Sequence, residues 1–182
     1  MFVSKKVGIL AMQGAFDAHY KTVAACSASP FYIKKPEDLE QAQAIILPGG
    51  ESTTQFDMLK KANLNEALID FAKKDFPIFA TCAGVILLAR LNLLAVSIER
   101  NAYGSQKYSF ETLLQIPKLG DTPFEGIFIR APKLSKLNKD LEILSDFKND
   151  PVLIKSKNIL AATFHPELTN DLRLHKYFLE LL

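Results

Sequence analysis

Hydrophobic positions in the first half of the chain come as short, uninterrupted runs and do not alternate strictly with polar positions. Four of these runs have the length of a β-strand. They comprise residues 7–12, 31–33, 44–47 and 76–80. Apolar runs without alternation are typical of parallel strands that are covered on both faces. The pattern therefore predicts four parallel strands.

Between these runs, hydrophobic residues recur at helical spacing. Phe16, Tyr20 and Val23 would share one face of a helix over residues 15–28. Further helices are predicted over residues 52–62, with Ser52 or Thr53 as N-cap, and over residues 64–73 and 83–90. Strands and helices in alternation indicate an α/β fold. We expect a three-layer, open, mostly parallel sheet with helices on both faces.

The pattern changes after Arg90, where strand-like segments follow one another and helices are scarce. Strands are predicted over residues 94–99, 107–115, 126–130, 141–147, 152–155 and 159–164, and a final helix over residues 168–182. We interpret this part as antiparallel strands at one side of the sheet, with the last helix packing back on it. No repeat or linker divides the chain, so residues 1–182 are expected to form one domain.

Composition and charge exclude several classes of protein. Hydrophobic residues make up 48% and charged residues 23%, which excludes a largely disordered chain. The net charge is +2 without a basic block, so nothing favours nucleic acid or an anionic membrane. The two cysteines have no metal-ligand spacing, and the N-terminal apolar run is too short for a signal or membrane segment. We expect a soluble cytoplasmic protein without metal or cofactor.

Cys82 stands where a predicted strand passes directly into a predicted helix. The segment Thr81-Cys82-Ala83-Gly84 has the form of a nucleophile elbow, in which a sharp turn exposes the nucleophile at the carboxyl end of a strand. The helix N-terminus would favour the thiolate, and the N–H of Ala83 would face a developing oxyanion. Free cysteines are also common as small buried hydrophobes, and this segment alone does not decide between the two. Cys26, in a predicted helix, is interpreted as structural.

A cysteine nucleophile needs a base, and the chain has three histidines. His165 follows the predicted strand over residues 159–164, and in extended backbone positions i and i+2 face the same side. Glu167 could therefore orient the imidazole of His165, which would give a Cys–His–Glu arrangement. His19 and His175 lie in predicted amphipathic helices and are interpreted as surface or packing residues. The sequence alone does not show that His165 meets Cys82.

The segment Leu47-Pro48-Gly49-Gly50-Glu51-Ser52-Thr53-Thr54 also follows a predicted strand. Two adjacent glycines let the backbone approach a ligand and direct N–H groups at it, as an oxyanion hole requires. A plain tight turn before a capped helix has the same composition. Both interpretations stay open on this segment alone.

Together these segments resemble the class I (triad) glutamine amidotransferases and, among them, the glutaminase subunits of pyridoxal 5′-phosphate synthase. The order Pro-Gly-Gly-Glu, Thr-Cys-Ala-Gly, His-Pro-Glu is that of the class. The similar segments are residues 9–16, 47–54, 81–84, 99–104, 128–132 and 163–169. They span nearly the whole chain, and the resemblance implies a flavodoxin-like α/β fold.

The resemblance also implies roles for individual residues. Cys82 would attack the side-chain amide of glutamine, His165 would act as base and then acid, and Glu167 would orient it. Gly49 and Ala83 would hold the oxyanion through their N–H groups. The implied glutamine-binding residues are Gly49, Gly50, Glu51, Ser52, Arg100, Ile129 and Arg130. A guanidinium fork suits the carboxylate of an amino acid, which gives Arg100 and Arg130 a physical reason to be there.

The resemblance implies a partner as well: a (β/α)₈-barrel synthase subunit, in a hetero-oligomer that channels ammonia into pyridoxal 5′-phosphate. In such enzymes the region of Gln13-Gly14 contacts the synthase and helps to activate the glutaminase. This chain departs from the usual pattern in two places. Ala80 stands where glycine is usual, and the connection over residues 89–99 is short.

Three other interpretations compete with this one. The first is another amidotransferase of the class, such as the glutaminase of imidazole glycerol phosphate synthase; the segments over residues 51–54 and 100–104 disfavour it. The second is a catalytically silent α/β binding protein with a redox-active Cys82, for which the His-Pro-Glu element would have no purpose. The third is a hydrolase of another small amide.

Overall fold

A seven-stranded sheet forms the centre of the molecule. The computed structural model describes residues 4–99, 109–136 and 138–182. The strand order is β2-β1-β3-β4-β11-β10-β9, and β10 runs antiparallel to both of its neighbours, whereas β2, β1, β3, β4 and β11 are parallel. The strands are β1 (Lys6–Leu10), β2 (Ser29–Ile33), β3 (Ala44–Leu47), β4 (Ile78–Thr81), β9 (Glu142–Phe147), β10 (Asp150–Ser156) and β11 (Ile159–Ala162).

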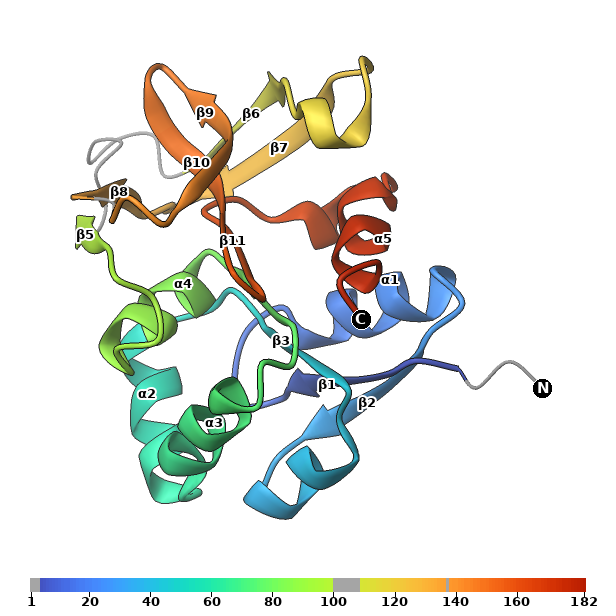
Figure 1. Cartoon of the computed structure of the whole chain (residues 1–182), viewed down its shortest axis with the longest axis vertical. Helices are drawn as coiled ribbons and strands as arrows, with labels where there is room; N and C mark the ends of the chain where they lie inside the picture. The colour runs from blue at the N-terminus through green and yellow to red at the C-terminus, as the bar shows by residue number, and fades with distance from the viewer. Residues whose placement is uncertain (1–3, 100–108, 137) are drawn as a thin grey trace.

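Helices cover both faces of this sheet. Figure 1 shows α1 and α5 on one side of β1 and β3, and α2, α3 and α4 on the other. The helices are α1 (Phe16–Ala25), α2 (Ser52–Lys61), α3 (Leu64–Lys73), α4 (Ala83–Arg90) and α5 (Arg173–Leu179). The predicted fold class is therefore confirmed. Within the described residues, no helix is long and apolar enough to cross a membrane.

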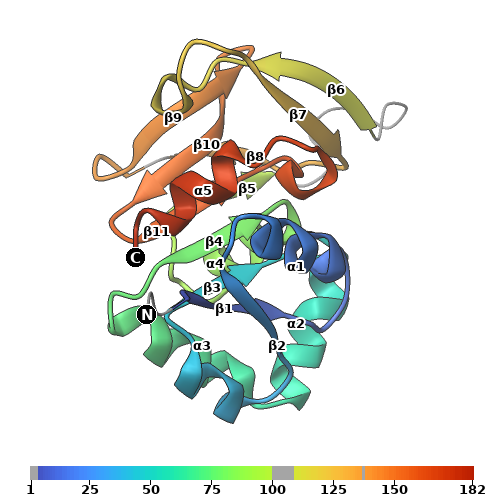
Figure 2. The ribbon, with the colours of Figure 1, turned by 90° about the vertical axis from the view of Figure 1, so that its right-hand side faces the viewer.

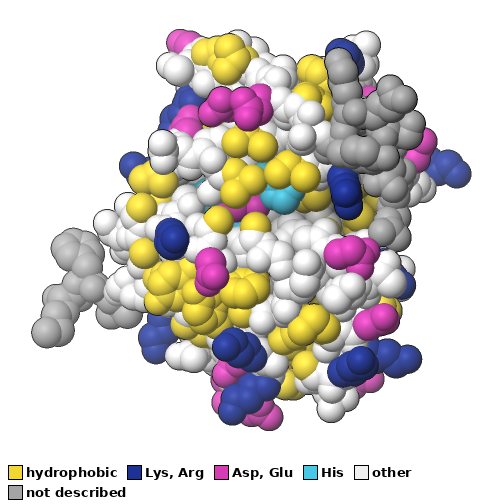
Figure 3. All heavy atoms as spheres, turned by 180° about the vertical axis from the view of Figure 1, so that it is seen from behind, with side chains coloured by type: hydrophobic (Ala, Val, Ile, Leu, Met, Phe, Trp, Pro, Cys, Tyr) yellow, Lys and Arg dark blue, Asp and Glu magenta, His cyan; other side chains and the backbone are white. Residues whose placement is uncertain are grey.

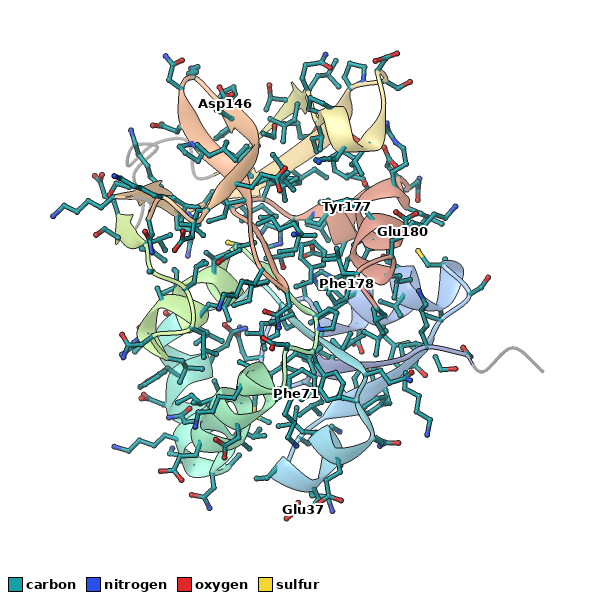
Figure 4. All side chains as sticks on the ribbon, in the orientation of Figure 1. Glu37, Phe71, Asp146, Tyr177, Phe178 and Glu180 are labelled. Carbon is teal, nitrogen blue, oxygen red and sulfur yellow. The ribbon has the colours of Figure 1, made fainter. Side chains whose placement is uncertain are left out.

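The sheet separates two hydrophobic clusters, and this explains why its strands lack alternation. In β3, Ile45 and Leu47 belong to one cluster and Ala44 and Ile46 to the other, and all four are buried. Successive side chains of a strand point to opposite faces, so a strand with two covered faces needs apolar residues at every position. Figure 4 labels Phe71 on α3 and Phe178 on α5, which belong to opposite clusters.

Two small antiparallel sheets lie beside the central sheet. They are formed by β5 (Ser97–Glu99) with β8 (Lys133–Ser135), and by β6 (Ser109–Leu114) with β7 (Phe124–Ile129). Figure 2 shows β6, β7, β9 and β10 together at one end of the molecule, with α3 at the other. Leu114, Phe124 and Phe128 pack into the cluster beneath α1 and α5. Three 3₁₀ helices complete the described elements: η1 (Pro36–Gln41), η2 (Pro117–Leu119) and η3 (Pro166–Leu168).

The structure corrects two details of the predicted helices. The N-cap of α2 is Glu51 and not Ser52 or Thr53, because the Glu51 carboxylate accepts hydrogen bonds from the N–H groups of Thr53 (3.1 Å) and Thr54 (2.7 Å). The last helix is shorter than predicted and begins at Arg173. Before it, Thr169 Oγ1 donates to Pro166 O and accepts from Asp171 N–H, which gives the backbone an alternative to helix.

Gly84 allows α4 to start against the end of β3, and this contact yields a testable prediction. A Cβ at Gly84 would lie 2.0 Å from Leu47 O, a backbone atom, whereas a Cβ at Gly8 would meet the flexible end of Ile33, with Cδ1 at 2.5 Å. We expect Gly84→Ala to lower the free energy of unfolding by about 3 kcal/mol and the control Gly8→Ala to lower it less. Urea denaturation of both variants measures this. Equal losses of unfolding free energy in the two variants would show that the Leu47 carbonyl can move to make room for the added methyl group.

Candidate active site

Cys82 lies in a strained turn at the carboxyl end of β4. Its φ is +46°, a region that residues other than glycine rarely occupy, and its N–H donates to Ala162 O at 2.8 Å. Ala83, the next residue, begins α4. This is the predicted strand–turn–helix geometry, in which the backbone holds the thiol at a helix N-terminus. The side chain is buried except for a small part that faces a cavity.

The carboxyl ends of three neighbouring parallel strands converge at this point. β4 lies between β3 and β11 in the sheet. The loop at Gly49 follows β3, Cys82 follows β4, and His165 follows β11. A Cβ built at Gly49 would lie 2.4 Å from His165 Cε1 and 3.1 Å from Cys82 Cβ, so the glycine leaves room for both side chains. Residues far apart in the sequence thus meet where open α/β sheets bind ligands.

His165 is held between Cys82 and Glu167. Its backbone N–H donates to Ile127 O at 2.8 Å, and its Nδ1 lies 2.7 Å from Glu167 Oε1. Burial acts to lower the pKa of His165, but the hydrogen bonds and charges of Cys82 and Glu167 outweigh it and raise the pKa to about 10. The thiol sulfur also lies 3.5 Å from Ile129 O. The three side chains form a continuous series from the cavity into the interior.

Glu167 reaches His165 by a different backbone geometry from the one predicted. Pro166 begins the 3₁₀ helix η3 and His165 is its N-cap, so the two side chains meet across a turn and not along an extended strand. Burial acts to raise the pKa of the Glu167 carboxyl, but His19 and the hydrogen bond with His165 outweigh it and hold the pKa below its usual range. The carboxylate is therefore ionised at neutral pH.

The loop after β3 is tied to the loop after β1 by a buried glutamine. Gln55 Nε2 donates to Gln13 O at 2.7 Å and to Pro48 O at 3.2 Å, and Gln13 Oε1 accepts from the N–H of Glu51 at 2.7 Å. Gln55 was not among the residues predicted to belong to the site. Its position one turn into α2, on the buried side, was the available signal. The N–H of Gly49 donates to Thr81 Oγ1 at 3.1 Å.

A cavity of about 610 Å³ opens above Cys82. It is lined by Gln13, Gly50, Glu51, Ser52, Cys82, Ala83, Ile86, Ile129, Arg130, Pro132 and His165. Of the predicted glutamine-binding residues, Gly49 lies behind this lining, against His165. Arg100 lies outside the described residues. In the space-filling view of Figure 3, a histidine side chain is visible among hydrophobic side chains near the centre of the face.

Two of the lining residues present their polar groups differently. Ser52 Oγ is buried and has no hydrogen-bond partner among the described residues, so it can bind a ligand in the cavity. The carboxylate of Glu51, by contrast, is bound by Thr53 and Thr54, and these hydrogen bonds lower its pKa to about 2. Glu51 therefore organises the N-terminus of α2 beside the cavity with its side chain.

His19 and His175 are fully buried and bonded to polar groups, so neither is a surface residue. His19 Nε2 lies 3.0 Å from Thr81 Oγ1 and 3.3 Å from Glu167 Oε2, and His19 Nδ1 lies 3.0 Å from His175 Nε2. Burial lowers the pKa of both imidazoles, that of His175 to about 3. The polar series behind Cys82 is thus longer than the sequence indicated.

The lowered pKa of His175 predicts a pH dependence of stability. The unfolded imidazole titrates near 6.5 and the folded one near 3, so the neutral, folded form is favoured above pH 6.5 and this contribution is lost as the pH falls toward 3. As the pH falls from 6.5 to 4, we expect the unfolding free energy to decrease more steeply in the wild type than in His175→Gln. The difference between the two slopes should reach up to about 1.4 kcal/mol per pH unit. Urea denaturation at several pH values measures both slopes. Parallel slopes would contradict a neutral His175.

Comparison with known proteins places this chain among glutamine amidotransferases. The model of the SNO glutamine amidotransferase family matches residues 9–182. The pyridoxal 5′-phosphate synthase subunit PdxT of Thermotoga petrophila is 48% identical, over 97% of this chain and 99% of its own length. The PdxT of Pelotomaculum thermopropionicum is also 48% identical, over 96% of this chain and 94% of its own length. A crystal structure of a glutamine amidotransferase has a TM-score of 0.91 at 39% identity, covering 96% of this chain and 97% of its own.

Proposed function

The chain belongs to the SNO glutamine amidotransferase family, and on this basis we propose that it is the glutaminase subunit of a pyridoxal 5′-phosphate synthase. It hydrolyses L-glutamine to L-glutamate and ammonia, and its partner uses the ammonia to make pyridoxal 5′-phosphate (vitamin B6). The relatives named above are subunits of that synthase and match over nearly their whole length. The observation that carries the chemistry is the contact of Cys82, His165 and Glu167 beneath the cavity.

The arrangement of Cys82, His165 and Glu167 suits acyl transfer through a thioester. His165 takes the proton of the Cys82 thiol as the sulfur attacks the side-chain amide carbon of glutamine, and it then gives that proton to the departing nitrogen, which leaves as ammonia. Water then attacks the glutamyl thioester, with His165 taking its proton and returning one to the sulfur. Glu167 accepts the Nδ1–H of His165 and stabilises the imidazolium. The N–H groups of Ala83 and Gly49 stabilise the oxyanion.

The cavity offers distinct groups to the two ends of glutamine. The lining includes Gly50, Glu51 and Ser52 at the start of α2, and Ile129 and Arg130 at the end of β7. Arg130 binds the α-carboxylate through its guanidinium fork, and Arg100 joins it. Gly50 is constrained in this lining, because a Cβ there would lie 2.5 Å from Gln13 Oε1. Residues 1–182 act as one amidotransferase domain.

The partner is a (β/α)₈-barrel synthase subunit in a cytoplasmic hetero-oligomer. Free ammonia is largely protonated at neutral pH, and the ammonium ion is not nucleophilic, so direct transfer between the subunits is chemically sensible. The hydrogen bond of the Gly49 N–H supports the hypothesis that the partner controls the glutaminase activity. This N–H is bonded to Thr81 Oγ1 and must leave that bond before it can serve an oxyanion. The isolated chain is thus short of one oxyanion donor.

Replacement of the nucleophile tests the catalytic assignment. We expect Cys82→Ala to abolish glutamate release from glutamine, because without the sulfur no thioester forms. Cys26→Ala is the matched control, since Cys26 is the other cysteine of the chain and lies at the C-terminal end of α1, with its Sγ 4.0 Å from Leu172 O. It should leave the rate unchanged. A coupled assay that detects glutamate measures the rate of both variants. Hydrolysis of glutamine by Cys82→Ala at the wild-type rate would refute the assignment of Cys82, His165 and Glu167 as a catalytic triad.

Addition of a cognate synthase subunit tests the partner. We expect glutamine hydrolysis by the isolated chain to be slow and to rise at least about tenfold when the synthase is added, because one oxyanion donor is worth about 10²-fold in rate. The measurement is the initial rate of glutamate formation at saturating glutamine, with bovine serum albumin as the protein control. Full activity of the chain alone would contradict partner control.

A further inference from the structure

The peptide group that joins Pro48 to Gly49 is held at both of its ends. Its N–H donates to Thr81 Oγ1 at 3.1 Å, and its carbonyl oxygen, Pro48 O, accepts from Gln55 Nε2 at 3.2 Å. The N–H and the carbonyl of a trans peptide group point in opposite directions, and no cis peptide bond occurs among the described residues. Rotation of this peptide group therefore breaks both hydrogen bonds.

The Thr81 end of the peptide group faces the interior of the protein. Thr81 is fully buried at the end of β4, and its hydroxyl lies 3.0 Å from Nε2 of His19, which is also fully buried. Thr81 is not among the residues that line the cavity above Cys82. The N–H of Gly49 is thus directed into the interior and not toward the place where a glutamine amide would meet the thiol.

The carbonyl end is held by Gln55, a buried polar residue of α2 with 1% of its surface exposed. Its Nε2 carries two hydrogens and donates to two backbone carbonyls, Gln13 O at 2.7 Å and Pro48 O at 3.2 Å. The other end of the same amide, Oε1, is buried and has no hydrogen-bond partner among the described residues. Exchanging the two ends of the amide would set this oxygen against two carbonyl oxygens, so the carbonyls determine its orientation.

The amide of Gln55 links two loops at some cost. A buried acceptor without a partner is unfavourable, and this offsets part of what the two hydrogen bonds contribute to stability. The link itself joins the loop after β1, at Gln13, to the loop after β3, at Pro48. A backbone hydrogen bond from the N–H of Ala15 to Gly49 O, at 3.0 Å, joins the same two loops. The orientation of the peptide group therefore depends on where the loop after β1 lies.

We propose that Gln55 is a positioning residue that holds the Pro48–Gly49 peptide group with its N–H turned away from the cavity, and that this restraint limits hydrolysis by the isolated chain. Without the Gln55 amide, Pro48 O is a buried acceptor with an unsatisfied lone pair in the present orientation, which favours rotation of the peptide group. The same amide binds Gln13 O, so displacement of the loop after β1 weakens the restraint. The effect on catalysis rests on the function proposed above, whereas the restraint on the peptide group does not.

The first experiment measures the hydrogen bond of the Gly49 N–H directly. Hydrogen exchange of backbone amides, followed by NMR, reports how often this N–H leaves its acceptor. We expect the Gly49 amide of the wild type to exchange at least about tenfold more slowly than in an unfolded chain. In Gln55→Met, which has a side chain of similar length without a donor, exchange should be about fivefold faster than in the wild type. An unprotected Gly49 amide in the wild type, or equal exchange in the two proteins, would overturn the proposal.

A pair of variants tests the other end of the peptide group by the same measurement. Thr81→Val keeps the shape of the side chain and removes the acceptor, so the Gly49 amide should again exchange about fivefold faster. Thr81→Ser keeps the hydroxyl and should exchange within about twofold of the wild type. Equal exchange of the Gly49 amide in these two variants would show that the hydroxyl does not hold the N–H, and the restraint would then be refuted.

The second experiment compares glutamine hydrolysis with and without the synthase subunit. We expect Gln55→Met to raise the rate of the isolated chain at least about threefold at saturating glutamine. With saturating synthase the rate should stay within about twofold of the wild type, so the ratio of the two rates falls. A merely structural role of Gln55 would not lower this ratio by raising the rate of the isolated chain.

Leu59→Val is the matched packing control for Gln55→Met. Leu59 is fully buried on the same face of α2, one turn after Gln55, and belongs to the hydrophobic cluster on that side of the sheet. The substitution removes one methylene group and touches neither hydrogen bond of the peptide group. It should leave the Gly49 exchange rate and the ratio of the two hydrolysis rates within about twofold of the wild type.

The outcomes separate this inference from the proposed function. If the wild type does not hydrolyse glutamine even with its partner, the proposed function is wrong, and the exchange of the Gly49 amide still decides whether Gln55 restrains the peptide group. Faster exchange in Gln55→Met without faster hydrolysis by the isolated chain would refute the limit on catalysis. Equal effects of Gln55→Met and Leu59→Val would refute the role of the amide, because a general loosening of α2 would then be the cause.

Discussion

The turn between β4 and α4 is the constraint on which the rest of the site depends. It places Cys82 at a positive φ and brings α4 so near to β3 that a Cβ at Gly84 would lie 2.0 Å from Leu47 O. The turn therefore works only if β3 and β4 are neighbours and if the residue two positions after Cys82 is glycine. The same neighbour relation brings the Gly49 loop beside the thiol. One backbone contact thus sets the position of both the Cys82 thiol and the Gly49 loop.

A second constraint comes from the buried charge of Glu167. An ionised carboxylate in the interior is costly unless it is paired and hydrogen-bonded. Here Oε1 is bonded to His165 Nδ1 at 2.7 Å, and His19 Nε2 lies 3.3 Å from Oε2, which has no hydrogen-bond partner among the described residues. α1 is therefore more than cover for the sheet, because it brings His19 beside the buried carboxylate, and α5 brings His175 against His19.

The sequence predicted best those elements that local signals delimit. The bounds of β3 (Ala44–Leu47), α3 (Leu64–Lys73) and α4 (Ala83–Arg90) agree with the prediction, because each is an apolar or amphipathic run with a clear boundary, such as the proline after Leu47. The N-cap at Glu51 was missed because a glutamate there competes with two better capping residues beside it. The shortened last helix depends on side-chain hydrogen bonds of Thr169 that spacing does not reveal.

The site, too, has residues that local sequence identifies and residues that only long-range contacts identify. Cys82 and the Gly49-Gly50 loop stand directly after strands and were found from their local context. That His165 meets Cys82 depends on β11 pairing with β4, and strand order is not written in local sequence. His19 was assigned to surface or packing because helical spacing alone does not distinguish a buried polar contact from a solvent-exposed one. Its contacts, Glu167 and His175, come from residues near the other end of the chain.

Ala80 shows how a departure from the usual pattern is accommodated. The motif that the chain resembles has glycine at this position, next to the turn at Cys82, so an added methyl group could have disturbed that turn. In the structure Ala80 is a fully buried residue of β4, paired with Leu47 on one side and Ala161 on the other. Its side chain belongs to the cluster beneath α2, α3 and α4, the face opposite that of Phe79. The methyl group therefore fills core space on the side away from His19 and His175, and the alanine at the neighbouring position of β11 leaves room for it.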